Sequence, residues 1–64
     1  MNLARLKGIM AERGVSQREL AKMLGLSTKS VNAKINGRVD ITINEAVLIS
    51  KVLRIENPGA IFFE

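Results

Sequence analysis

The stretch SQRELAKMLGLSTKSVNAKING, residues 16–37, decides the fold of this chain. It holds two short segments with helical periodicity that meet at Gly25, and the second segment is polar and basic. Ser16 and Glu19 have the spacing of a capping box, in which the two side chains satisfy free backbone N–H groups at a helix start. Glycine permits the left-handed backbone that ends a helix and opens a tight turn. The pattern predicts two short helices joined by a few residues.

Further signals for helix starts occur outside this stretch. Thr42 and Glu45 repeat the capping-box spacing, Ser27 can cap another helix, and Asn57 is a suitable cap before a proline at the first helical position. Hydrophobic staples support three of these starts, with the pairs Val15 and Leu20, Leu26 and Val31, and Ile41 and Ala46. We expect helices at about residues 3–13, 16–24, 27–36, 42–54 and 57–63, and therefore an all-α domain that spans residues 1–64.

Composition excludes several classes of function. A chain of 64 residues supports one small core, and this chain has no Cys and no His. Thiol nucleophiles, imidazole bases and the common zinc-binding spacings are therefore absent, and we expect no enzyme, no catalytic residue, no metal, no cofactor and no small-molecule ligand. No segment approaches the roughly 20 apolar residues of a membrane span, and no secretory signal is recognisable. The expected location is the bacterial cytoplasm.

The positive charge is concentrated in one part of the chain. Residues 1–39 carry eight Lys and Arg against two Glu, a balance of +6. Residues 40–64 carry two Lys and Arg against four acidic residues, a balance of −2. The basic part contains the two-helix stretch, which favours a polyanionic partner such as nucleic acid.

A family resemblance follows from particular positions: Gln17, Ala21, Gly25, Val31 and the ending KING at 34–37. This set resembles the helix-turn-helix of phage repressors and Cro proteins, and the resemblance extends over nearly the whole chain. It implies a compact five-helix, lambda-repressor-like domain whose second and third helices form the helix-turn-helix. It also implies that the 27–36 helix enters the major groove of double-stranded DNA, and that Gln17 and Asn36 contact phosphate.

The sequence departs from many members of that family at one pair of positions. Those members join the first helix to the recognition helix by a buried Arg and Glu, where this chain has Met10 and Ile35. We expect an apolar contact at this point. Such an exchange removes a desolvation cost and leaves the predicted fold intact.

The outward face of the 27–36 segment carries short polar side chains suited to base edges. Lys29 can donate to guanine O6 or N7, Asn32 can pair with adenine, and the Thr28 methyl group can touch a thymine methyl group. The predicted base-reading residues are Thr28, Lys29, Asn32, Ser30 and Ala33. The predicted phosphate-contacting residues are Gln17, Ser27, Lys34, Asn36 and Arg38.

The segment 42–54 is apolar nearly all round, and a domain of this size cannot bury every side of it. We therefore expect a homodimer, with an interface formed by Leu48, Val52, Ile55 and Phe63. A two-fold dimer would also double the base readout on a pseudo-palindromic operator. The expected function is that of a Cro-like phage or prophage repressor. The alternatives are an antitoxin-type regulator or a protein-interaction adaptor on the same fold.

Overall fold

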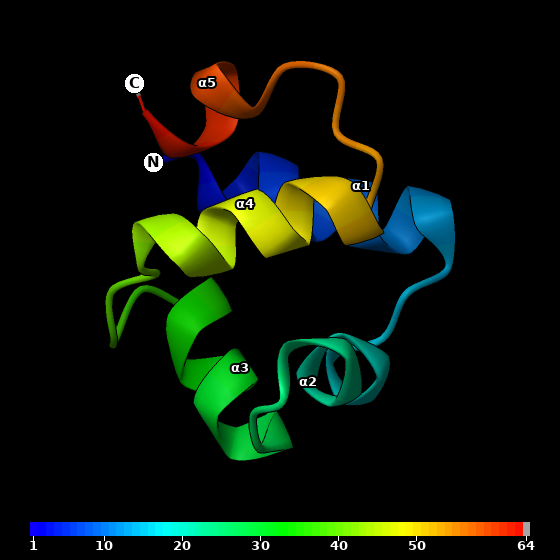
Figure 1. Cartoon of the computed structure of the whole chain (residues 1–64), viewed down its shortest axis with the longest axis vertical. Helices are drawn as coiled ribbons and strands as arrows, with labels where there is room; N and C mark the ends of the chain where they lie inside the picture. The colour runs from blue at the N-terminus through cyan, green and yellow to red at the C-terminus, as the bar shows by residue number, and fades with distance from the viewer. Residues whose placement is uncertain (64) are drawn as a thin grey trace.

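The computed structural model describes residues 1–63 and consists of helices only within that range. The five helices are α1 (Leu3–Arg13), α2 (Gln17–Leu24), α3 (Thr28–Ile35), α4 (Ile43–Val52) and α5 (Pro58–Phe62). In Figure 1, α4 lies across the middle with α1 behind it, α2 and α3 lie below them, and α5 lies above. The predicted all-α, five-helix fold is confirmed.

The capping chemistry expected from the sequence sets most helix starts. Ser16 Oγ accepts from the Glu19 N–H at 3.1 Å, and Glu19 Oε1 accepts from the Ser16 N–H at 3.2 Å. Thr42 and Glu45 make the equivalent pair of bonds at 3.1 and 2.9 Å. Ser27 Oγ accepts from the Ser30 N–H at 3.0 Å. These local bonds fix the starts of α2, α3 and α4 within one residue of the predicted positions.

Two predictions near the C-terminus need correction. The segment expected to be helical to residue 54 ends at Val52, because Arg54 has a φ of 53°, in the left-handed region that interrupts a helix. Arginine rarely adopts this conformation, and a glycine is the usual signal for it. Because position 54 holds an arginine, the sequence does not mark this helix end. Pro58 occupies the first turn of α5 as expected, but the Asn57 side chain makes no capping hydrogen bond.

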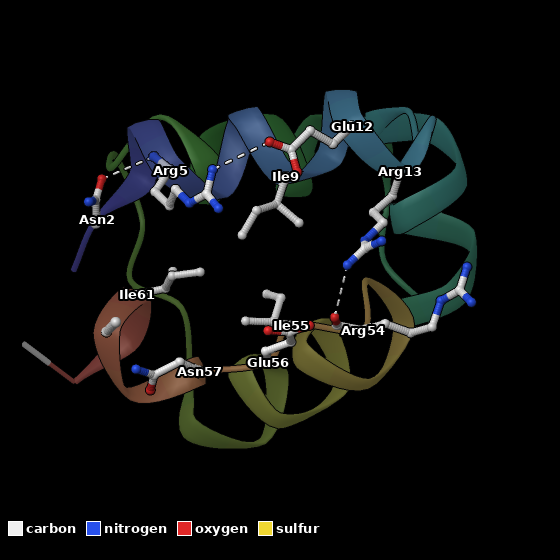
Figure 2. Close-up of a pocket in the computed structure, with 11 residues that line it drawn as sticks. Asn2, Arg5, Ile9, Glu12, Arg13, Arg54, Ile55, Glu56, Asn57 and Ile61 are labelled. Atoms are coloured by element: carbon white, nitrogen blue, oxygen red, sulfur yellow. Dashed lines mark hydrogen bonds and ion pairs between the residues drawn. The ribbon is translucent and has the colours of Figure 1, made fainter.

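The end of α4 is held by a side chain from α1. Arg13 Nε donates to the carbonyl oxygen of Leu53 at 3.1 Å, and Arg13 Nη2 donates to that of Arg54 at 3.3 Å. Figure 2 shows this guanidinium reaching across from α1 to the segment after α4. The arginine therefore satisfies free carbonyl groups and complements the negative end of the helix dipole.

The core is apolar and draws on every helix. Its most completely buried side chains are Leu6, Leu20, Val31, Ile49 and Leu53. Met10 and Ile35 are 5% and 3% exposed and belong to the same core, so both positions of the departing pair hold buried apolar side chains. The N-terminus is tied to α5, since the Asn2 N–H donates to the Ile61 carbonyl at 2.7 Å. The core thus packs α3 against α1 and α2.

Candidate nucleic-acid interface

The turn between α2 and α3 has the geometry that the sequence predicts. Gly25 adopts a φ of 70°, and its neighbour Leu26 donates its N–H to the Ala21 carbonyl at 2.9 Å. Ala21 is 2% exposed, and α2 and α3 are in extensive contact. A larger side chain at Ala21 would separate the two helices. The turn and the small residue together fix the angle at which α3 is presented.

The α3 helix turns its apolar residues inward and its polar residues outward. Val31 and Ile35 are buried in the core. All five predicted base-reading residues lie on this one helix: Thr28 and Lys29 are exposed, and Ser30, Asn32 and Ala33 are half-buried. The structure therefore brings the predicted set together on a single element, with the exposed residues in its first turn.

A hollow of about 400 Å³ lies at the junction of α1, α2 and α3. Lys7, Ser16, Gln17 and Asn36 contribute its polar lining. Lys7 Nζ donates to Asn36 Oδ1 at 2.7 Å and retains two further N–H groups. Two residues that the sequence assigned to phosphate, Gln17 and Asn36, thus share one hollow with a lysine from a different helix.

Lys7 was missed by the sequence analysis. It lies one helical turn before Met10, the α1 residue that is buried near Ile35. That register places its side chain beside the end of α3. The relation between Met10 and Ile35 was the signal that could have found it.

Comparison with known families agrees with this geometry. A sequence model of a family described as helix-turn-helix matches residues 6–56, most of the chain. The chain belongs to this helix-turn-helix family, of the Cro and C1 type. It is therefore a DNA-binding regulator. No curated protein and no solved structure was found to match the chain. No helix within residues 1–63 combines the length and apolarity needed to cross a membrane.

Two other residues assigned to phosphate are exposed near the ends of α3 in this helix-turn-helix protein. Arg38 lies in the loop after α3, and its N–H donates to the Ala33 carbonyl at 2.9 Å, which fixes the backbone there. The Ser27 hydroxyl accepts from the Ser30 N–H and donates to Ser30 Oγ at 3.0 Å. A hydroxyl has one hydrogen to donate, and Ser27 already donates it to Ser30. In the free protein this hydroxyl is therefore engaged as a helix cap.

Lys34, for which the sequence predicts a phosphate contact, is engaged within the domain. Its side chain is 13% exposed, and its Nζ pairs with Glu45 Oε1 at 2.9 Å. The same Nζ donates to the Asp40 carbonyl at 3.0 Å. Lys34 therefore joins α3 to the start of α4, and its charge is neutralised within the domain.

The Lys34 contact also alters the ionisation of Glu45. Burial alone raises the pKa of this carboxyl. Hydrogen bonds from the Thr42 N–H and from Lys34, together with the lysine charge, lower the pKa by more than burial raises it. The pKa of Glu45 therefore lies below its usual value of about 4.5. The carboxylate remains charged at neutral pH and stabilises the start of α4.

Of the four residues assigned to a dimer interface, two line the same hollow. Ile55 and Phe63 line an apolar hollow of about 280 Å³ between α4 and α5, together with Val47. Phe63 and Leu48 are 63% and 44% exposed, whereas Val52 and Ile55 pack partly against the core. On α4, Leu48 follows Val47 by about 100°, so it projects toward a different side of the helix. Ile61 and Phe62 close the core.

A larger hollow of about 600 Å³ lies between α1 and the segment after α4 (Figure 2). Its charged side chains are largely engaged with one another or with the backbone. Arg5 pairs with Glu12 at 3.4 Å, and Arg13 bonds two carbonyl groups. Two of the three arginines that line this hollow are therefore engaged within the domain.

Proposed function

We propose that this protein is a Cro-like repressor that binds a pseudo-palindromic operator as a homodimer, with α3 in the major groove. The observation that carries the proposal is the convergence of Lys7, Gln17 and Asn36 on one hollow beside the C-terminal end of α3, the helix whose first turn exposes Thr28 and Lys29. Amide and ammonium donors at this position can hold a phosphate group. In the proposed complex, the duplex extends from there along α3 to the exposed residues of its first turn.

In the proposed complex, base reading falls chiefly to the exposed residues of α3. Lys29 would donate to guanine O6 or N7, and the Thr28 methyl group would contact a thymine methyl group. Ala33 lies about one helical turn after Lys29 and would add an apolar contact, with Ser30 beside it as a further hydroxyl donor. Arg38 would add a phosphate contact from the loop after α3.

Dimerisation is supported by the apolar surface that the monomer leaves uncovered. Val47 and Phe63 are 45% and 63% exposed beside the hollow between α4 and α5, and Ile55 forms part of its wall. Leu48 extends the apolar surface on another side of α4. One short recognition helix contacts only a few base pairs, so two copies with half-sites about 34 Å apart provide the discrimination that a regulator needs.

The proposal is tested by selecting bound duplexes from random DNA and measuring affinity for a selected and a mixed-sequence duplex at two salt concentrations. We expect a selected site with two-fold symmetry, preferred over mixed DNA by about 10³-fold or more, and affinity that falls steeply with salt. Binding that is absent or insensitive to salt would favour a protein-interaction adaptor instead.

The dimer has its own test by sedimentation of the protein, free and bound to the selected duplex. Two copies are expected on each palindrome. A single copy on a complete palindrome would contradict the dimer and leave the DNA-binding surface intact. Repression itself is tested by transcription from a promoter that overlaps the selected site, where increasing protein should reduce the transcript.

A further inference from the structure

A chain of hydrogen bonds runs across the side of α3 that faces α2 and α1. Asn32 Nδ2 donates to Gln17 Oε1 at 3.0 Å. Asn36 Nδ2 donates to the Asn32 carbonyl at 2.8 Å, and Asn36 Oδ1 accepts from Lys7 Nζ at 2.7 Å. Asn32 of α3 and Asn36 at its C-cap thus hold the side chains of Gln17 from α2 and Lys7 from α1.

The polarity of the Gln17 amide decides whether it can hold a phosphate. Phosphate oxygens accept hydrogen bonds only, so Gln17 must present Nε2 and not Oε1 to the DNA. The Gln17 amide meets that condition when a donor occupies its Oε1. Asn32 Nδ2 supplies this donor in the free protein.

We propose that Asn32 is a positioning residue that acts through Gln17, rather than a side chain that reads adenine by itself. The inference rests on the proposed DNA-binding function. Pairing with adenine uses both the Nδ2 and the Oδ1 groups of an asparagine. Here one of the two Nδ2 hydrogens is already bonded to Gln17, which turns the amide toward α2 and away from the position that pairing with adenine requires.

The place of Asn32 on α3 supports this role. It is half-buried, and it projects about 100° away from Ala33, toward α2. Thr28 and Lys29, which are exposed in the first turn, are left to meet the bases. The α3 helix is therefore divided into a base-reading side and a side that orients phosphate contacts.

A double-mutant cycle tests the inference with Gln17→Ala, Asn32→Ala and the double variant. Each protein is titrated with a duplex selected by the wild type and with a mixed-sequence duplex. Asn32→Ala is expected to weaken binding to both duplexes by about 3- to 10-fold. In the Gln17→Ala background the same substitution should have no further effect, because the residue through which it acts is gone.

Two results would overturn the inference. One is a loss confined to the selected duplex, which would make Asn32 a base-reading residue. The other is an undiminished loss in the Gln17→Ala background. If the wild type binds neither duplex, the proposed function fails before the inference is tested, so the two failures are distinct. Melting temperatures of all four proteins establish that the comparison concerns folded molecules.

Asn32→Asp provides a second, isosteric variant. A carboxylate cannot donate to Gln17 Oε1, so the Gln17 amide should turn its Nε2 inward and present Oε1 to the phosphate. Binding to both duplexes should weaken more than with Asn32→Ala. Because the new negative charge also repels DNA, the loss is compared with that of Asn32→Asp in the Gln17→Ala background. A smaller loss there isolates the contribution of amide orientation, and equal losses would contradict it.

Discussion

Arg54 is the position where one substitution is expected to stabilise this protein. It follows α4 with a φ of 53°, a conformation that costs a residue with a β-carbon about 1–2 kcal/mol. Arg54→Gly removes that cost. The greater conformational freedom of glycine in the unfolded chain lowers the stability again by about 0.5–1 kcal/mol. The net gain in the free energy of unfolding is about 0.5–1 kcal/mol. For a domain of this size, that gain raises the melting temperature by about 2–8 °C.

Arg54→Gly should change the backbone conformational cost without removing a tertiary side-chain contact. Its side chain is exposed, and the hydrogen bond that it receives from Arg13 goes to its carbonyl oxygen, which every residue keeps. Arg54→Ala is the matched control, since it removes the same side chain but keeps the β-carbon. Thermal and urea unfolding should give Arg54→Gly the higher stability of the two. If both variants unfold together, the left-handed backbone is not costly at this position and the reasoning is refuted.

Three further substitutions test the core, the ion pair and the charged surface. Ile35→Glu should lower stability by about 3 kcal/mol or more, because it buries an unpaired carboxylate, and adding Met10→Arg should recover part of the loss in thermal unfolding. Glu45 has a lowered pKa, so its stabilisation is complete above the usual glutamate pKa and is lost as pH falls through the lowered one. The advantage of wild type over Glu45→Gln in urea unfolding should therefore shrink between about pH 7 and about pH 3. Lys7→Ala should reduce the slope of log affinity against log salt by about 1, whereas Arg54→Ala, which removes an exposed positive charge after α4, should leave it unchanged.

Features of the fold that depend on neighbouring residues were predictable from the sequence. The capping boxes at Ser16 and Thr42 involve groups three residues apart, so their spacing alone locates two helix starts. The end of α4 was not predictable in this way. It depends on a left-handed arginine whose carbonyl is held by Arg13, 41 residues earlier in the chain. No local pattern marks such a contact.

The candidate site divides along the same line. Helical periodicity places Thr28 and Lys29 on the outside of α3, because Val31 and Ile35 must face the core. Periodicity does not reveal which lysine meets an acceptor from another helix. Lys7 and Lys34 look alike in the sequence, yet one lies beside Asn36 and the other is paired with Glu45. Tertiary packing decides which of the two charges is available to DNA.

The placement of these lysines determines which cations near α3 can neutralise phosphate groups in the proposed complex. With Lys34 neutralised by Glu45, the cations on α3 or beside its ends are Lys7, Lys29 and Arg38. If each neutralises one phosphate, one protomer contributes a slope of about −2.7 to log affinity against log salt, and a dimer about −5.4. A measured slope near the larger value would support two protomers on the DNA, because the three cations near α3 of one protomer account for only half of it.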